Sequence, residues 1–441
     1  MMKSIQEQLE NFHAGDTEFH QAVLEVYEDI KYFYGRHDVY ETYNIAARMM
    51  EPDRIVRFRV TWQNDDGGIE VNRGWRVQFN NALGAYKGGL RFHPSVNESI
   101  LKFLGFEQCF KNALTGLPMG GGKGGSDFDP KGRSDMEVMR FCQSYMQELC
   151  RYIGPNVDVP AGDINVGTRE IGYLFGHYLK LENQFHGVIT GKGTDYGGSC
   201  GRVEATGYGC IYFLEEMLNA HDKELKGKKV IISGAGNVAL HAAEKAIQEG
   251  AKVLCLSDSK GLLHFKDGLK DEDLQKIKTI KVDNHGALKD FDGAGEYKSG
   301  AEPWDINADI ALPCATQNEI DEAEAKKLVK NGVMALAEGA NMPLTAKAQE
   351  VLIENKIIYG PGKAANAGGV AVSGLERTQN AEMRSWSLER VDDELRNIMK
   401  DIHRRCIEHV NKEDGVYPYR RGANITSFKK IADTLVAYGL K

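Results

Sequence analysis

The sequence predicts an α/β protein of two domains, the second built on a doubly wound parallel sheet. With 441 residues, the chain is longer than one hydrophobic core usually serves. From residue 229 onward, short apolar runs alternate with amphipathic stretches, which is typical of strands and helices in a parallel sheet. Glycine-rich turns, among 49 glycines in all, separate these runs and indicate backbone that approaches a ligand closely.

The first domain, expected over residues 1–200, opens with helices and continues with strands. Apolar residues recur near helical spacing between Phe19 and Ile30, so residues 1–50 are predicted to be helical. Residues 54–60 and 75–79 alternate partly between apolar and charged side chains, which predicts two strands that each have one wet face. The run Asp65-Asp66-Gly67-Gly68 supplies the turn between them. Helices are expected over residues 95–113 and 134–152.

The second domain, expected over residues 201–375, contains a dinucleotide-binding fingerprint. The run Ser233-Gly234-Ala235-Gly236-Asn237-Val238-Ala239 fits G-x-G-x-x-A, follows a predicted strand at residues 230–232 and opens a helix. Gly234 permits a tight turn, Gly236 lets the backbone approach a pyrophosphate, and Ala239 allows close helix packing. A second strand follows at residues 253–256 and ends at Asp258, at the spacing that the fingerprint requires. An ordinary glycine-rich turn is the alternative, which the complete strand–turn–helix context disfavours.

Residue chemistry alone leaves the choice of dinucleotide open. Asp258 would bond ribose hydroxyls and repel an extra phosphate, which favours NAD. Ser257, Ser259 and Lys260 surround it and could hold a phosphate, which favours NADP.

Three lysines, two of them beside glycines, form a second group of candidate residues. Lys87 precedes Gly88-Gly89, Lys111 lies on a predicted helix, and Lys123 stands among five glycines. A P-loop is excluded for Lys123, because the pattern would need Gly at 117 and Ser or Thr at 124. Burial and nearby cations would lower the pKa of such a lysine and make it available as a base, and Asp163 supplies a carboxylate. The alternative is that these are surface lysines on flexible loops.

Composition excludes several classes of protein. The formal net charge of −8 argues against non-specific nucleic-acid binding. The eight cysteines form no C-x-x-C pair and are expected to be free thiols in a reducing compartment. The spacing of His403 and His409 does not place them on one helix face, so no metal site is expected. No signal peptide and no membrane span is expected, and a cytoplasmic location follows.

A set of motifs across nearly the whole chain resembles the Glu/Leu/Phe/Val dehydrogenase family, in particular the small hexameric glutamate dehydrogenases of bacteria and fungi. The motifs that carry the resemblance are residues 87–92, 120–125, 160–163, 204–209, 312–318 and 366–374. The resemblance implies a substrate site in a cleft between the domains, and C-terminal helices over residues 376–441 that return to the first domain.

The resemblance also implies a role for each matching residue. Lys87 and Ser373 would hold the side-chain carboxylate of the substrate, and Gln108 and Lys111 its α-carboxylate. The Gly162 backbone would touch the substrate, and Lys123 and Asp163 would carry the proton chemistry. The remaining implied positions contact the cofactor or line the substrate and nicotinamide region: Thr190, Thr206, Asn237 and Asn341.

The implied activity is the reversible oxidative deamination of L-glutamate to 2-oxoglutarate and ammonium, in a homohexamer without a metal. The run Ser257-Asp258-Ser259 resembles the NADP-using members, but Ala287 stands near the place of a second basic residue expected after Lys281. NADP is therefore favoured, and NAD or dual use stays open. A dehydrogenase of an apolar amino acid is disfavoured, because Lys87 would be left buried and unpaired. A non-catalytic dinucleotide sensor would not need Lys123 and Asp163 together.

Overall fold

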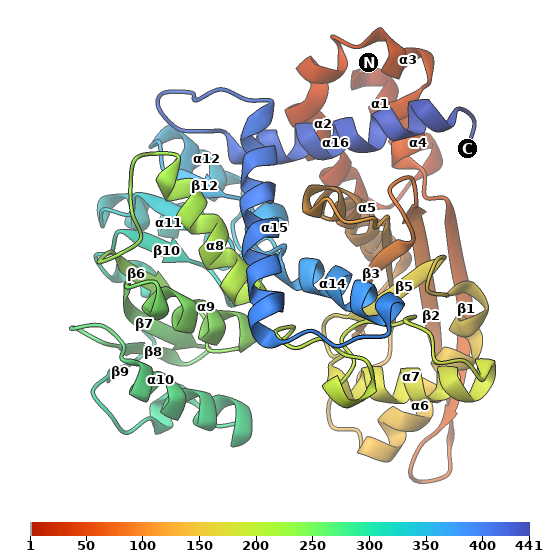
Figure 1. The fold of residues 1–441 in the computed structure, drawn as a ribbon, viewed down its shortest axis with the longest axis horizontal. Coiled ribbons are helices and arrows are strands. Elements are labelled where there is room, and N and C mark those ends of the chain that lie inside the picture. The colour runs from red at the N-terminus through yellow and green to blue at the C-terminus, as the bar shows by residue number, and fades with distance from the viewer. Residues whose placement is uncertain (1) are drawn as a thin grey trace. The chain divides into compact units, whose positions relative to one another are not determined.

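The structure is a computed structural model that describes residues 2–441, and its chain divides into two compact units (Figure 1). Unit 1 comprises residues 1–200, 372–391 and 424–441, and unit 2 comprises residues 201–371 and 392–423. Each unit has its own sheet, as the α/β fold class predicted.

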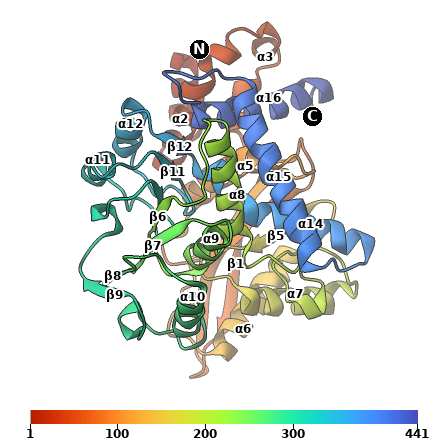
Figure 2. The same cartoon turned by 60° about the vertical axis from the view of Figure 1, so that its left-hand side comes forward.

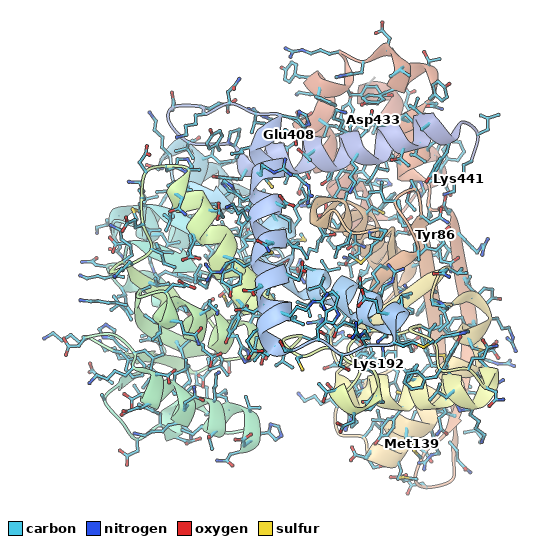
Figure 3. The ribbon with its side chains drawn as sticks, in the orientation of Figure 1. Tyr86, Met139, Lys192, Glu408, Asp433 and Lys441 are labelled. Atoms are coloured by element: carbon cyan, nitrogen blue, oxygen red, sulfur yellow. The ribbon has the colours of Figure 1, made fainter. Side chains whose placement is uncertain are left out.

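Unit 1 begins with the predicted N-terminal helices, whose apolar faces are buried. They are α1 (Met2–Phe12), α2 (Thr17–Tyr34), α3 (Asp38–Thr42) and α4 (Ile45–Met50). Phe19, Val23 and Ile30 of α2 are almost fully buried, as the helical spacing predicted. Residues 424–438 of α16 (Tyr419–Tyr438) pack here too. The Tyr40 hydroxyl donates to Asp433, which is labelled on α16 in Figure 3, at 2.6 Å.

The sheet of unit 1 is mixed, with strand order β1-β2-β4-β3-β5. Its strands are β1 (Arg54–Gln63), β2 (Ile69–Asn80), β3 (Tyr86–Phe92), β4 (Gly121–Ser126) and β5 (Asp158–Gly162). β1 and β2 form an antiparallel hairpin around the predicted turn, whereas β3 runs parallel to both β4 and β5. The parallel pairing brings the glycine-rich segments side by side.

Helices cover the unit 1 sheet and build its core. They are α5 (Glu98–Thr115), α6 (Asp135–Leu149) and α7 (Thr168–Glu182). One apolar cluster contains Phe92 and Phe128 together with residues of α6, such as Phe141, and of α7. Both predicted helices of this domain are present: α6 begins at the Ser134–Glu137 capping box, and α5 ends at Gly116 in the left-handed conformation.

The prediction of one wet face is wrong for residues 75–79 of β2. Arg76 and Gln78 are fully buried, and both side chains donate to Asp158 of β5 instead of facing water. The Arg76 guanidinium donates from Nε to Asp158 Oδ2 at 2.8 Å and from Nη1 to the Gly88 carbonyl at 3.0 Å. The charged residue in the pattern therefore marks a buried ion pair instead of solvent.

Unit 2 contains the predicted doubly wound sheet, with strand order β12-β11-β10-β6-β7-β8-β9. Its strands are β6 (Lys229–Ile232), β7 (Lys252–Asp258), β8 (Gly261–His264), β9 (Glu296–Ser299), β10 (Ile310–Leu312), β11 (Ala335–Ala337) and β12 (Ile358–Gly360). The strands from β12 to β7 are parallel, and β8 and β9 extend the sheet in antiparallel pairing. β6, the strand before the glycine fingerprint, lies in the middle.

Helices pack on both faces of the unit 2 sheet (Figure 2). One side carries α8 (Ala205–Asn219), α9 (Asn237–Gln248) and α10 (Asp271–Lys278), and the other carries α11 (Glu322–Lys330) and α12 (Ala346–Glu354). The short α13 (Gly362–Ala365) follows β12, and α14 (Gly368–Glu382) follows α13. Within residues 2–441, each of the eight cysteines is a free thiol, and six of them are buried.

The C-terminal segment 376–441, whose helices were expected to return to the first domain, is divided between the units. Residues 392–423, with most of α15 (Leu388–Glu408), belong to unit 2. The Tyr212 hydroxyl donates to Asp392 at 2.7 Å, and the His403 ring lies 5.9 Å from the ring of Phe213. These contacts with α8 fix α15 to unit 2. Among the residues that the structure describes, no helix is long and apolar enough to span a bilayer.

Replacing Arg76 by Met is expected to lower the free energy of unfolding by about 3–5 kcal/mol, because Asp158 would stay buried without its counter-ion. Denaturant titration measures the loss. Arg151→Met, which breaks the exposed pair with Glu148 on the same unit, is the control and should have a much smaller effect. Equal losses in the two variants would contradict the assignment of a buried, compensated pair.

Candidate active site

In unit 1 the predicted lysines lie on neighbouring strands whose register brings them together. In β3, Leu90 pairs with Gly124 of β4 and with Gly162 of β5. Lys123 therefore lies one residue before one partner, and Asp163 one residue after the other. Glycine is needed on β3 just before Leu90, because a Cβ at Gly88 would lie 1.7 Å from the Gly122 carbonyl oxygen and a Cβ at Gly89 would lie 2.8 Å from the Asp163 Cβ.

Lys87 is buried at the wall of this glycine-rich layer, with 1% of its surface exposed. Its ammonium donates to the hydroxyl of Thr190 at 2.8 Å. Thr190 is held in turn by its backbone N–H, which donates to the Pro160 carbonyl of β5 at 3.0 Å. The structure thus brings two of the predicted substrate residues into direct contact.

Gln108 and Lys111 lie three residues apart on α5, so they share one face of the helix. Both are partly exposed. Asn112, which the sequence analysis did not single out, anchors this helix: it donates to the carbonyls of Lys87 at 3.1 Å and Gly120 at 2.5 Å, and accepts from Gln108 at 2.7 Å. A fully buried asparagine therefore ties α5 to both glycine segments.

The buried Lys123 forms an ion pair with the partly exposed Asp163, with 3.1 Å between Nζ and Oδ1. Burial is the largest influence on the Lys123 pKa and lowers it, assisted by the positive charges of Arg91 and Arg76 and opposed by Asp163. Burial alone would raise the pKa of Asp163, but Lys123 and Arg91 outweigh it and lower the pKa to about 2. Asp163 is therefore ionised at neutral pH beside a lysine that deprotonates more easily than usual.

Arg91 is a further site residue to which the sequence analysis assigned no role. Its Nε donates to Asp163 Oδ2 at 2.8 Å, so the carboxylate bridges Arg91 and Lys123. Arg91 was part of a quoted motif, but its partner is 72 residues away. Nothing in the local pattern indicated that pairing.

Ser373 lies on α14 and is buried. A Cβ on its neighbour Gly374 would meet the side chain of Leu117 at 2.4 Å, which places this turn of α14 against the segment between α5 and β4. The Gly162 carbonyl faces Gly89, whose added Cβ would lie 2.7 Å away. Gly162 thus lies in the same glycine layer as Lys123 and Asp163.

In unit 2 the glycine fingerprint forms the turn between β6 and α9. Gly234 has a φ of +88°, which favours glycine, and Gly236 caps the start of α9 without a side chain that could block the first amides. A Cβ added at Gly236 would meet nothing within 4 Å, so the backbone is open to a ligand there.

Ala239 is fully buried against the sheet, as predicted. Asn237, next to Val238 at the start of α9, donates to the Val203 carbonyl at 2.5 Å. This turn fits a pyrophosphate group.

The residues at the end of β7 already have partners in the protein. Ser257 Oγ accepts from the Gly234 N–H at 3.0 Å and so shapes the glycine turn. Asp258 accepts from the backbone N–H groups of Lys260 at 3.0 Å and Leu288 at 2.9 Å. Asp258 thus holds the 286–290 segment beside the strand end.

Two further predicted residues lie in unit 2, away from the fingerprint in sequence. A Cβ at Gly369 would meet the Thr206 hydroxyl at 2.5 Å. Asn341 accepts from Asn366 at 3.0 Å, and it follows the carboxyl end of β11. Carboxyl ends of parallel strands are where doubly wound sheets bind their ligands. Within residues 2–441, no cluster of three or more His, Cys, Asp or Glu side chains is arranged to hold a metal ion.

Comparison with known proteins agrees with this geometry. Residues 197–439 match the family Glutamate/Leucine/Phenylalanine/Valine dehydrogenase, and residues 52–180 match the Glu/Leu/Phe/Val dehydrogenase dimerisation domain. The chain is 54% identical over 440 residues to the NADP-specific glutamate dehydrogenase of Psychrobacter sp. (strain TAD1), covering 98% of each chain. It is 50% identical over 443 residues to the NAD-specific glutamate dehydrogenase of Bacteroides fragilis (strain YCH46), covering 100% of this chain and 99% of that one.

Among solved structures, the glutamate dehydrogenase of Plasmodium falciparum superposes with a TM-score of 0.97 at 47% identity, covering 100% of this chain and 95% of the other. The matched segments include the glycine-walled lysines of unit 1 and the fingerprint of unit 2. The chain belongs to the Glu/Leu/Phe/Val dehydrogenase family.

Proposed function

We propose that the protein is an NADP-dependent glutamate dehydrogenase, which interconverts L-glutamate and 2-oxoglutarate with ammonium. The observation that carries the proposal is the pair of buried lysines, Lys87 and Lys123, in a glycine-walled layer with Asp163. Relatives about half identical over nearly the full length, named glutamate dehydrogenases, support it.

Substrate charge explains the choice of glutamate over an apolar amino acid. Lys87, with Thr190 and Ser373, takes the side-chain carboxylate, and Gln108 with Lys111 takes the α-carboxylate. Each charge-assisted hydrogen bond contributes about 1.5–3 kcal/mol. An apolar side chain would have to lie against the buried ammonium of Lys87, which costs desolvation without compensation.

The lysine–aspartate pair carries the proton chemistry. When bound, the nicotinamide ring would supply the acceptor for the hydride that leaves the substrate α-carbon. The substrate amine, having lost a proton, is then an imine, which water hydrolyses. Lys123, whose pKa burial lowers, acts in its neutral form as the base that activates the attacking water. Asp163 lies 3.1 Å from Lys123 and passes protons to and from it, while the Gly162 backbone orients the substrate.

Unit 2 residues would hold the cofactor. The first amides of α9 and the turn of Gly234 and Gly236 take the pyrophosphate, and Thr206, Asn237 and Asn341 make further contacts. NADP is favoured because the run Ser257-Asp258-Ser259 resembles the NADP-using members and because an NADP-specific relative is 54% identical over nearly the full length. The carboxylate near this position also keeps NAD use as a second candidate.

We infer two further properties from the family. The enzyme is a homohexamer, and it works in the cytoplasm, where its eight free thiols stay reduced.

The direct test supplies 2-oxoglutarate and ammonium, separately with NADPH and with NADH, and follows the absorbance of the reduced cofactor. We expect oxidation of NADPH at the higher kcat/KM. Leucine oxidised faster than glutamate in the reverse direction would overturn the substrate assignment, and a preference for NADH would overturn the cofactor assignment.

Replacing Asp163 by Asn removes the proton carrier and keeps the size of the side chain. Turnover is expected to fall by about 10²–10⁴-fold, as is typical of a general acid–base group. Glutamate affinity, measured by equilibrium binding, should change little. Intact turnover would remove Asp163 from the mechanism.

Replacing Arg91 by Gln is expected to move the pH dependence of glutamate oxidation. The base must be neutral, so activity rises with pH as Lys123 loses its proton, below the usual value of 10.5. Arg91 lowers the pKa of both Lys123 and Asp163, so its loss raises both. The rise in kcat/KM should shift to higher pH in Arg91→Gln.

Arg151→Gln, at an exposed position of the same unit, is the matched control for this shift. Its profile should superimpose on that of the unaltered enzyme. Superimposable profiles for Arg91→Gln as well would show that Arg91 does not tune the base.

A further inference from the structure

A fully buried ion pair in unit 1 lies next to the residues proposed to hold the substrate's side-chain carboxylate. Lys192 and Glu376 have no exposed side-chain surface, and their charged atoms are 2.7 Å apart. Lys192, labelled in Figure 3, follows Thr190 by two residues, and Glu376 follows Ser373 by three on α14. Ser373 and Glu376 are therefore one turn apart on the same helix.

The Glu376 carboxylate orders the chain on both sides of Thr190. One oxygen accepts from the backbone N–H of Gly191 at 2.8 Å, and the other accepts from the Lys192 ammonium. The same ammonium donates to the Ile189 carbonyl and, at 3.0 Å, to Asn380. Since Ile189 and Gly191 flank Thr190, the position of its hydroxyl depends on this network.

Thr190 itself is attached to the sheet of unit 1. Its N–H donates to Pro160 of β5, and its hydroxyl accepts from Lys87 of β3. Asn380, one turn after Glu376, donates to the Gly197 carbonyl at 2.7 Å and extends the attachment of α14 to this segment. The groups proposed to bind the substrate's side-chain carboxylate thus come from β3, from the segment around Thr190 and from α14. The buried carboxylate of Glu376 links the last two.

Joining a helix to a loop by a buried ion pair has a large desolvation free energy, because two charges must lose their water. Apolar side chains of the same volume would fix the helix equally well. They would not accept the Gly191 N–H, and they would not hold the Ile189 carbonyl. The ion pair therefore orders the backbone on both sides of Thr190 in addition to fixing the helix that carries Ser373.

We propose that the Lys192–Glu376 pair is a positioning device for substrate specificity, setting Thr190 and Ser373 relative to Lys87 so that the site favours a side chain ending in a carboxylate. The inference rests on the proposed glutamate dehydrogenase activity. Neither residue needs to contact the substrate.

The test compares L-glutamate with L-2-aminopentanoate, which has the same chain length and no side-chain carboxylate. In Glu376→Gln, we expect KM for glutamate to rise by about tenfold or more, the scale of one charge-assisted hydrogen bond. The kcat for glutamate should stay within about threefold, because Lys123 and Asp163 are untouched. The kcat/KM for L-2-aminopentanoate should stay constant, so discrimination between the two substrates falls.

The double variant Lys192→Met/Glu376→Gln carries no unpaired buried charge, so it tests the same point if the single variant does not fold. It too should lose discrimination. Lys102→Met, which replaces a buried lysine paired with the partly exposed Asp16 elsewhere in unit 1, is the control for general destabilisation and should leave discrimination unchanged.

Lower thermal stability with unchanged KM and unchanged discrimination in both Glu376 variants would overturn the inference, because the pair would then be structural only. Absence of glutamate turnover in the unaltered enzyme would overturn the proposed function itself. The two failures are therefore distinguishable.

Discussion

The site in unit 1 depends on the burial of positive charge against the backbone of glycine-rich strands. Lys87, Lys123 and Arg76 are all at least 95% buried, and an uncompensated buried ion costs several kcal/mol. Asp158 compensates Arg76, Asp163 compensates Lys123, and the Thr190 hydroxyl accepts from Lys87. Close approach of these groups requires strands without side chains between them, which is why Gly88 and Gly89 stand where they do.

The sequence predicted the parts of the molecule that short-range spacing encodes. The glycine fingerprint, its strand and its helix lie within a few residues of one another, and the structure confirms their order. The lysines among glycines were also visible, because glycine on both sides of a charged residue is a local feature. The surface alternative for them is wrong for Lys87 and Lys123, which are buried.

Pairings over long distances in the chain could not be predicted. Arg76 meets Asp158 82 residues away, and Lys192 meets Glu376 184 residues away. On β2, a charged residue between apolar ones has the same pattern whether it faces water or a buried counter-ion, so the wet-face prediction failed there. The division of residues 376–441 between the units likewise depends on contacts such as Tyr212 with Asp392, which no periodicity records.

Acidic residues in this protein repeatedly order loops that carry few side chains of their own. Asp258 accepts two backbone N–H groups at the end of β7, Glu376 accepts that of Gly191, and Glu338 accepts that of Gly362 at 2.6 Å. A carboxylate can accept several hydrogen bonds at once, so it suits glycine-rich segments that have only backbone to offer. A chain with a net charge of −8 can therefore still present cationic sites, because some of its carboxylates lie beside backbone amides that they order. Asp258 has this role in ordering the loop whichever dinucleotide binds, so the residue type at position 258 alone does not decide the cofactor.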